Sequence, residues 1–141
     1  MLKFKTTDTM HVNIRRFCLA LVACLCMSGS VSAIVRNPMI WADVPDPDVI
    51  RVGEYYYMVT TTMHLMPGAP IMRSKDFSNW ETIGYLFDRL TDSPKYDMED
   101  GTVYGRGQWA TSLRYHKGTF YALFAPNDNL GGDTYIMTAK D

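Results

Sequence analysis

Beyond residue 26 the chain contains no cysteine, because its three cysteines are Cys18, Cys24 and Cys26. The rest of the chain therefore has no disulfide framework, thiolate nucleophile or cysteine-ligated metal site. Charge of one sign is not in excess either, since 14 Lys and Arg face 15 Asp and Glu. A nucleic-acid-binding surface usually needs a basic excess, so we expect no nucleic acid partner. The apolar run at 17–27 is shorter than the roughly 20 residues of a membrane-spanning helix, and we expect no membrane span.

Residues 1–33 have the pattern of an export signal. Two arginines precede the apolar run, and a Val-Ser-Ala exit ending at Ala33 follows it. We predict a secretory signal peptide that is cleaved after Ala33, and hence an exported protein, periplasmic or extracellular. A lipoprotein is the alternative, because Leu-Val-Ala-Cys ending at Cys24 resembles a lipobox. The apolar run continues past Cys24, which favours plain cleavage.

The remaining residues, 34–141, predict an all-β fold. They carry 10 basic and 14 acidic side chains, and no segment repeats apolar residues at the helical period. Segments in which apolar and polar residues alternate, or which are rich in β-branched and aromatic residues, are typical of strands when Gly, Pro, Asn or Asp bound them. Four segments have this character, at 48–52, 55–61, 69–74 and 80–87.

The strand pattern returns once along the chain. Gly118 follows Gly53 by 65 residues, and Ile136-Met137 follows Ile71-Met72 by the same interval. A repeated four-stranded unit indicates β-propeller blades. We place the first blade at about 46–90 and an incomplete second blade at about 108–141. Because propellers close with four to eight blades, we expect the chain to be the N-terminal fragment of a longer protein.

The acidic segment before the first strand contains the strongest catalytic candidate, Asp46. Pro45 and Pro47 flank it, and Pro47 is expected to push the Asp46 backbone towards an extended conformation. A carboxylate held rigidly where an innermost strand begins suits a general base. An acidic turn is the alternative, and the local pattern alone favours it.

A series of short motifs changes that balance. In chain order it comprises Asn37-Pro38-Met39-Ile40, Pro45-Asp46-Pro47, Arg51-Val52-Gly53, Tyr56-Tyr57, Pro67-Gly68, Ser74-Lys75-Asp76 and Asn79-Trp80. Together these motifs resemble the opening of glycoside hydrolase family 43, and the resemblance extends over residues 37–141. It implies a five-bladed β-propeller with inverting β-xylosidase or α-L-arabinofuranosidase activity, and it implies that Asp46 is the general base.

The resemblance also implies what the chain does not contain. An inverting glycosidase needs a second carboxyl as general acid, about 6.5–9.5 Å from the base. In the family this acid is a Glu of the third blade, and an Asp that tunes its pKa lies shortly beyond the second-blade segment. We expect both to follow residue 141, so we expect the 141-residue chain alone to be inactive.

Three further residues are implied to bind substrate: Trp109, Met63 and His64. Trp109 lies in a segment that resembles the family's Trp-Ala-Pro motif, with Thr111 in place of the proline. Trp109 as a core residue between blades, and His64 as a loop residue, stay open as alternatives. Asp48 stands where many xylosidase-like family members have a small residue, and we expect it to be a turn acid at the start of a strand.

The expected function is therefore that of an exported inverting glycosidase. Its substrates would be xylo- or arabino-oligosaccharides from plant polysaccharides, and no cofactor or metal site is expected. A non-catalytic glycan-binding propeller and an unfolded truncated gene product are the alternatives.

Overall fold

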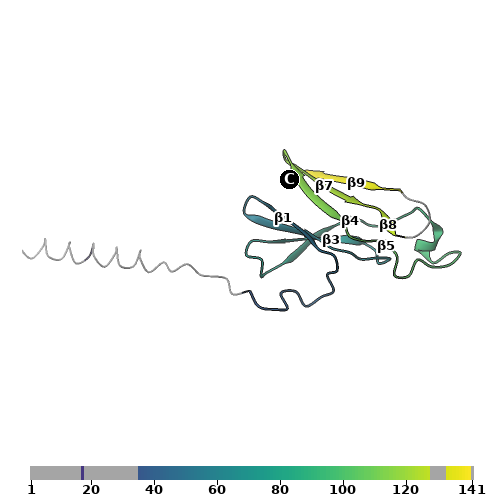
Figure 1. Cartoon of the computed structure of the whole chain (residues 1–141), viewed down its shortest axis with the longest axis horizontal. Helices are drawn as coiled ribbons and strands as arrows, with labels where there is room; N and C mark the ends of the chain where they lie inside the picture. Colours follow the sequence, from purple (N-terminus) through teal and green to yellow (C-terminus); the bar gives the residue numbers. More distant parts are fainter. Residues whose placement is uncertain (1–16, 18–34, 128–132, 141) are drawn as a thin grey trace, which may run out of the picture. The chain divides into compact units, whose positions relative to one another are not determined.

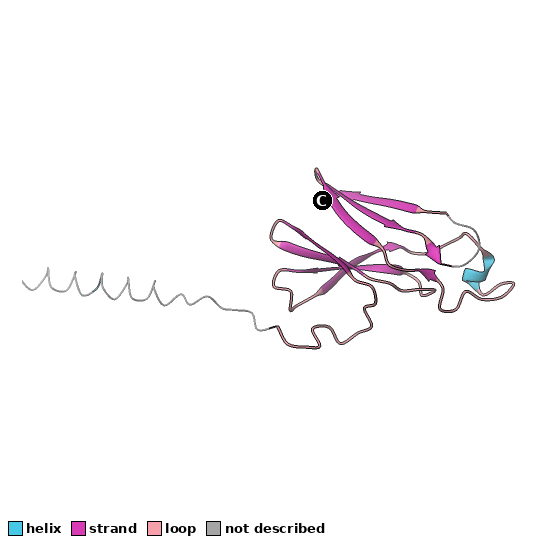
Figure 2. Ribbon diagram, in the orientation of Figure 1, coloured by secondary structure: helices cyan, strands magenta, loops and turns pink. Residues whose placement is uncertain are grey.

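The computed structural model describes Phe17, residues 35–127 and residues 133–140. The chain divides into two units, 1–32 and 33–141, and the expected signal peptide falls, apart from Phe17, outside the described residues. In the part of the chain that the structure describes, no helix is long and apolar enough to cross a membrane. The second unit is built from strands, with one short 3-10 helix, η1 (Pro94–Asp97) (Figures 1 and 2).

The first sheet is a complete antiparallel meander. Its strands lie in chain order and are β1 (Asp48–Val52), β2 (Tyr55–Val59), β3 (Gly68–Ser74) and β4 (Glu81–Phe87) (Figure 1). All four correspond to segments that the sequence predicts as strands, with ends that shift by at most two residues. The first predicted blade is therefore confirmed as a four-stranded unit.

The second sheet repeats the first three strands. It contains, in the order β6-β7-β9, the antiparallel strands β6 (Ser112–His116), β7 (Thr119–Phe124) and β9 (Tyr135–Lys140). A separate two-stranded pair joins β5 (Gly107–Gln108) to β8 (Pro126–Asn127). The all-β prediction and the incomplete second unit are both confirmed.

The two hairpins use their glycines at different turn positions. Gly53, with φ of 59°, is the first of the two turn residues between β1 and β2, whereas Gly118 is the second between β6 and β7. The second turn has Lys117 and Gly118 both at positive φ, as a type I′ turn requires. The strands of the first hairpin consequently recur after 64 residues and not after the 65 that separate the glycines.

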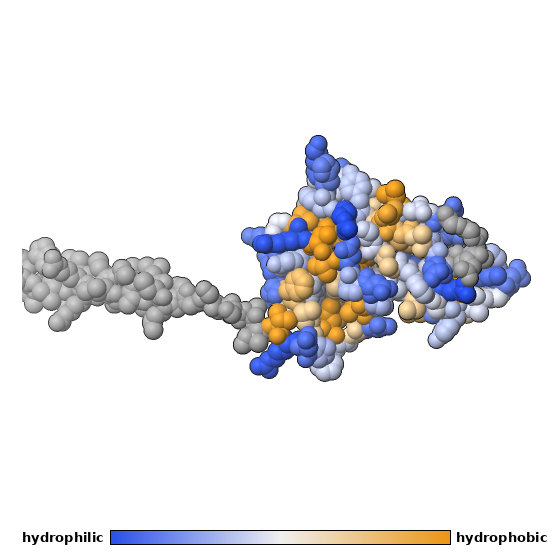
Figure 3. Space-filling view, viewed as in Figure 1, coloured by the Kyte–Doolittle hydropathy of each residue, from blue (hydrophilic) through white to orange (hydrophobic). Residues whose placement is uncertain are grey.

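The difference of one residue between these two intervals determines which side chains of the repeated strands face the core. A shift of one residue along a strand exchanges its two faces. The two sheets pack through one buried cluster that contains Tyr57 and Val59 of β2. Their counterparts at an interval of 64, Tyr121 and Leu123, are exposed together with Ile136 of β9. Apolar side chains thus reach the surface of the described unit (Figure 3), and these three lie on the face of the second sheet that is turned away from the first.

The core between the sheets contains residues from both. Its buried members are Tyr57, Val59, Ala69, Leu113 and Ala122. The rings of Tyr57 and Phe120 add a cross-sheet contact, with centroids 4.8 Å apart. Face-to-face burial of this kind is what holds neighbouring blades together.

Asp48 links the two sheets. Its Oδ2 atom accepts a hydrogen bond from the Leu113 backbone N–H at 2.7 Å and another from Arg114 Nη1 at 2.7 Å. Asp48 is the first residue of β1, as expected for an acid at a strand start, but the expected turn role is wrong because its carboxylate bonds across to β6.

Asp76 organises the turn between β3 and β4. Its Oδ1 accepts hydrogen bonds from the backbone N–H groups of Asn79 at 2.8 Å and Ser78 at 2.9 Å, and Oδ2 accepts one from Asn79 Nδ2 at 2.7 Å. These donors, the Asn79 backbone N–H first among them, hold the pKa of Asp76 far below its ordinary value of 3.8. The turn is therefore built around an ionised carboxylate.

Replacing this carboxylate has a pH-dependent effect. A group with a depressed pKa in the folded state stabilises the fold above its ordinary pKa, and the contribution is lost as the pH falls through the folded value. We expect Asp76→Ala to lower the urea midpoint equally at pH 7 and pH 5.5, and to lower it less once the pH is below the ordinary value of 3.8. Asp76→Asn keeps an acceptor oxygen and serves as the matched control. An Asp76→Ala deficit that stays constant at low pH would contradict this account.

Candidate active site

The site begins where β2 ends. Thr60 and Thr61 follow Val59 and are almost fully buried, with 1% and 4% of their surface exposed. Both bind the carbonyl oxygen of Pro45: the Thr60 hydroxyl donates at 2.5 Å and the Thr61 N–H donates at 3.0 Å. The strand end therefore holds the acidic segment by the peptide that precedes Asp46.

Asp46 itself has a left-handed backbone, with φ of 47°. The extended conformation expected from Pro47 is therefore wrong. The physical reason is that two donors fix the Pro45 carbonyl, and Asp is one of the few non-glycine residues that tolerate positive φ. The Asp46 side chain is exposed, and its Oδ2 accepts a hydrogen bond from the Thr61 hydroxyl at 3.1 Å. One carboxylate oxygen is thus anchored at a position that water can reach.

Gln108 crosslinks the loop after β2 to the start of the second sheet. It is the only glutamine of the chain, and its side chain is fully buried. Its Oε1 accepts hydrogen bonds from the Thr62 N–H at 2.8 Å and the Thr62 hydroxyl at 3.2 Å, while Nε2 donates to Thr111 Oγ1 at 2.7 Å. Thr111, which replaces the family's proline, thereby provides the acceptor for the buried amide.

The backbone of Met63 forms part of the same junction. Its N–H and carbonyl pair with the carbonyl and N–H of Gln108, each at 2.9 Å. Gly107, with φ of 102°, permits this approach, because a Cβ atom there would lie 2.4 Å from the Met63 carbonyl oxygen. The structure therefore places Met63 at the site through its main chain, with its side chain half-buried.

Three aromatic side chains meet around Gly105. The Gly105 N–H donates to His64 Nδ1 at 3.1 Å, and the Trp109 indole N–H donates to the Gly105 carbonyl at 3.3 Å. The ring of Tyr104 lies 4.7 Å from that of His64. Trp109 is 41% exposed among the described residues of this chain.

Trp109 and Asp46 are joined by a short path. Ala110, the neighbour of Trp109, donates its N–H to Thr61 Oγ1 at 2.8 Å, and Thr61 in turn donates to Asp46. The sequence-predicted residues Asp46, Met63, His64 and Trp109 therefore belong to one connected region. Sequence reasoning missed Thr61, Gln108 and Tyr104, although three consecutive threonines directly after a strand were a signal for the first of these.

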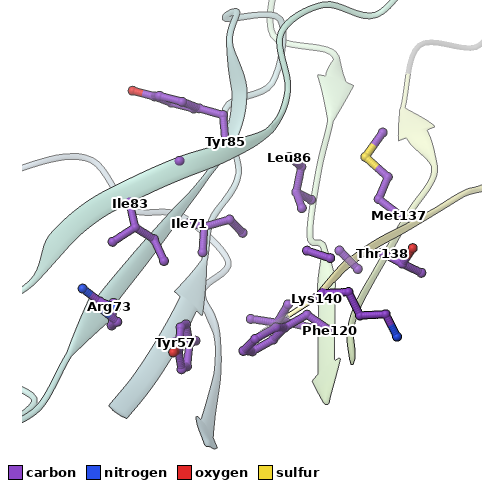
Figure 4. A pocket seen from close by; sticks show the side chains of 14 residues that line it. Tyr57, Ile71, Arg73, Ile83, Tyr85, Leu86, Phe120, Met137, Thr138 and Lys140 are labelled. Atoms are coloured by element: carbon purple, nitrogen blue, oxygen red, sulfur yellow. The ribbon is translucent and has the colours of Figure 1, made fainter. Parts of the chain in front are cut away.

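A cavity of about 370 Å³ lies elsewhere, between the two sheets. Figure 4 shows apolar side chains from both sheets around it, among them Ile71, Ile83 and Met137, together with the cationic Arg73 and Lys140. None of the described residues that line it is a carboxylate. Because acid–base hydrolysis requires carboxyl groups, the Asp46 region is the candidate active site and this cavity is not.

A repeated antiparallel meander defines a class of fold, the β-propeller. In this chain an exposed carboxylate lies just before β1 and an exposed indole lies nearby. The chain belongs to glycoside hydrolase family 43, whose family model, described as Glycosyl hydrolases family 43, matches residues 35–141. Members of this family hydrolyse glycosyl bonds.

Named relatives agree with this assignment. The chain is 45% identical over 85 residues to a beta-xylosidase of Formosa agariphila. The aligned region covers 60% of this chain and 14% of the relative. It is 39% identical over 110 residues to a non-reducing end alpha-L-arabinofuranosidase of Bacteroides ovatus, and this region covers 75% of the chain and 20% of the relative. The chain therefore spans a fifth or less of these curated relatives.

Solved structures match the fold as well. A bifunctional GH43-CE protein of Bacteroides eggerthii superposes with a TM-score of 0.71 at 44% identity, covering 76% of this chain and 14% of that one. A xylan beta-1,4-xylosidase of Bacillus halodurans gives a TM-score of 0.63 at 31% identity, covering 77% and 21%. The resemblance drawn from the short motifs and the β-propeller prediction are both confirmed.

Proposed function

We propose that the chain is the N-terminal part of a longer, exported, inverting glycosidase. Its substrates are β-xylosidic or α-L-arabinofuranosidic bonds in oligosaccharides from plant polysaccharides. Two kinds of support favour this. The similar proteins are named for these two activities, and they are about five to seven times longer than the region they share with the chain. The apolar run and small-residue exit before Ile34 favour export.

In this proposal Asp46 is the general base. Its carboxylate accepts a proton from a water molecule as the water oxygen attacks the anomeric carbon. The bond from that carbon to the leaving oxygen breaks on the opposite face, and a carboxylic acid of the longer protein protonates the leaving oxygen. The observation that carries the proposal is the hydrogen bond from Thr61 to Asp46 Oδ2, because it anchors one oxygen of an exposed carboxylate.

The residues around Gly105 serve substrate binding. The exposed indole of Trp109 offers a flat apolar face to the C–H surface of a sugar ring. His64 accepts the Gly105 N–H at Nδ1, so in its neutral form Nε2 carries the proton and donates to a sugar hydroxyl. Met63, whose side chain is half-buried, directly precedes His64 in the loop that follows the threonines holding Asp46.

The test uses the full-length protein and the isolated chain, each with aryl β-xyloside and aryl α-L-arabinofuranoside. We expect the full-length protein to turn over at least one substrate, with ¹H NMR showing that the first sugar released has the inverted anomeric configuration. The isolated chain is expected to show no turnover, since it cannot enclose a sugar. Retention of configuration would contradict the mechanism. Binding of xylo-oligosaccharides without hydrolysis by the full-length protein would favour the glycan-binding alternative.

A further inference from the structure

We propose that Thr61 is a positioning residue for the catalytic base, and that the second sheet orients its hydroxyl through the backbone N–H of Ala110. This inference rests on the proposed role of Asp46. It assigns the positioning of the carboxylate to a hydrogen-bonded chain, Ala110 N–H to Thr61 Oγ1 to Asp46 Oδ2, in which the two steps measure 2.8 and 3.1 Å.

The direction of this chain follows from the donors available. The Ala110 backbone N–H can only donate, so it occupies a lone pair of the Thr61 hydroxyl oxygen. The single hydroxyl proton is then directed to Asp46 Oδ2, which in a carboxylate can only accept. Each bond polarises the next and strengthens it.

Thr61 is suited to this task because it is buried and its backbone is hydrogen-bonded. Only 4% of its surface is exposed, and its N–H donates to the Pro45 carbonyl at 3.0 Å. Asp46, by contrast, is exposed, and its side chain would otherwise rotate freely in water. Thr61 thus binds the acidic segment twice, once at the main chain before Asp46 and once at its carboxylate.

The consequence for the reaction is that the two carboxylate oxygens acquire separate roles. Oδ2 is engaged with Thr61, which leaves Oδ1 to receive the proton of the attacking water. A loss of alignment of about 1 Å in a catalytic group can lower the rate by about 10²-fold. We therefore expect removal of the Thr61 hydroxyl to slow the chemical step without changing the affinity for the sugar.

Thr60 provides a matched control within the same strand end. It is also buried, at 1% exposure, and its hydroxyl donates to the Pro45 carbonyl at 2.5 Å. It has no hydrogen bond to the Asp46 carboxylate among those found in the described residues. Thr60→Val therefore removes a buried hydroxyl and a bond to the same segment, but it leaves the carboxylate bond in place.

The experiment compares Thr61→Val, Thr61→Ser, Thr60→Val and Asp46→Asn in the full-length enzyme. We expect Thr61→Val to lower kcat by about 10- to 100-fold with KM unchanged, which is the signature of an interaction needed in the transition state. Thr61→Ser retains the hydroxyl and should restore most of kcat. Thr60→Val should lower the melting temperature and reduce kcat much less than Thr61→Val does, because the Thr61 N–H still holds the Pro45 carbonyl and the bond to the carboxylate remains.

The outcomes separate this inference from the proposed function. If Asp46→Asn is inactive while Thr61→Val has normal kcat, or if Thr60→Val loses as much kcat as Thr61→Val, the positioning role is wrong and the general base stands. If Asp46→Asn is active, the proposed function itself fails. Should Thr61→Val not fold, Thr61→Ala removes the hydroxyl without placing a methyl group against the carboxylate, and the same comparison with Thr60→Ala decides.

Discussion

Asp46→Asn in the full-length enzyme is expected to lower kcat by about 10²- to 10⁴-fold, the usual contribution of a general base. An amide of nearly the same size cannot accept the proton of the attacking water. Its oxygen can still accept the hydrogen bond from the Thr61 hydroxyl, and Asn tolerates the φ of 47° as well as Asp does. The fold should therefore be kept, and steady-state assays with aryl glycosides together with a thermal melt measure both effects.

Asp43→Asn is the matched control for this prediction. Asp43 is an exposed acid three residues earlier in the same segment, and its replacement changes the charge by the same amount. It should leave kcat unaltered. Near-normal turnover by Asp46→Asn, or an equal loss from Asp43→Asn, would show that Asp46 is not the base.

Gln108→Leu is expected to give the largest loss of stability among the substitutions considered. Leucine has a similar volume but no polar atoms, so the half-buried Thr62 N–H and the buried Thr111 hydroxyl both lose their partner. Buried polar groups left without partners cost about 1–3 kcal/mol each, and we expect a total of about 2–4 kcal/mol. Such a loss is a large share of the 5–15 kcal/mol that stabilises typical domains. Thermal unfolding of the full-length protein measures it.

A double-mutant cycle shows whether this loss arises from the hydrogen bonds. Thr111→Val removes the acceptor of the Gln108 amide, so the double variant should be less destabilised than the sum of the two single variants. Simple additivity, or a melting temperature for Gln108→Leu equal to that of the unaltered protein, would mean that the amide contributes only its volume.

The strands could be predicted because their causes are local. Segments of aromatic and β-branched residues are bounded by the turn-forming residues Gly, Pro and Asp, and the two hairpin glycines mark the turns. The face of each repeated strand could not be read in this way. The glycines are 65 residues apart while the hairpins recur at 64, because Gly53 and Gly118 occupy different turn positions. Only the backbone geometry of the turns distinguishes these intervals.

In the candidate site as well, local motifs predict some residues, and others depend on partners that are distant in the sequence. Asp46 and Trp109 could be named from short motifs, since each lies within a recognisable segment. The partner that anchors Asp46 could not be named from a motif, because Thr61 lies 15 residues away. The same holds for the bond between Gln108 and Thr62, which are 46 residues apart. The left-handed backbone of Asp46 also depends on that partner strand, and the local effect of Pro47 pointed the other way.

Hydrogen bonds from residues 108–114 to residues of the first sheet and of the loop after β2 make the position of the Asp46 carboxylate depend on both sheets. Ala110 reaches Thr61, Gln108 reaches Thr62, and Leu113 and Arg114 reach Asp48. For recombination between family members, a crossover between residues 88 and 106 would therefore pair a carboxylate from one parent with the supporting backbone of another. A crossover before residue 37 would keep the carboxylate and its supporting backbone together, from the same parent. If Asp46 is the general base that we propose, the two sheets have to be inherited together for its support to be kept.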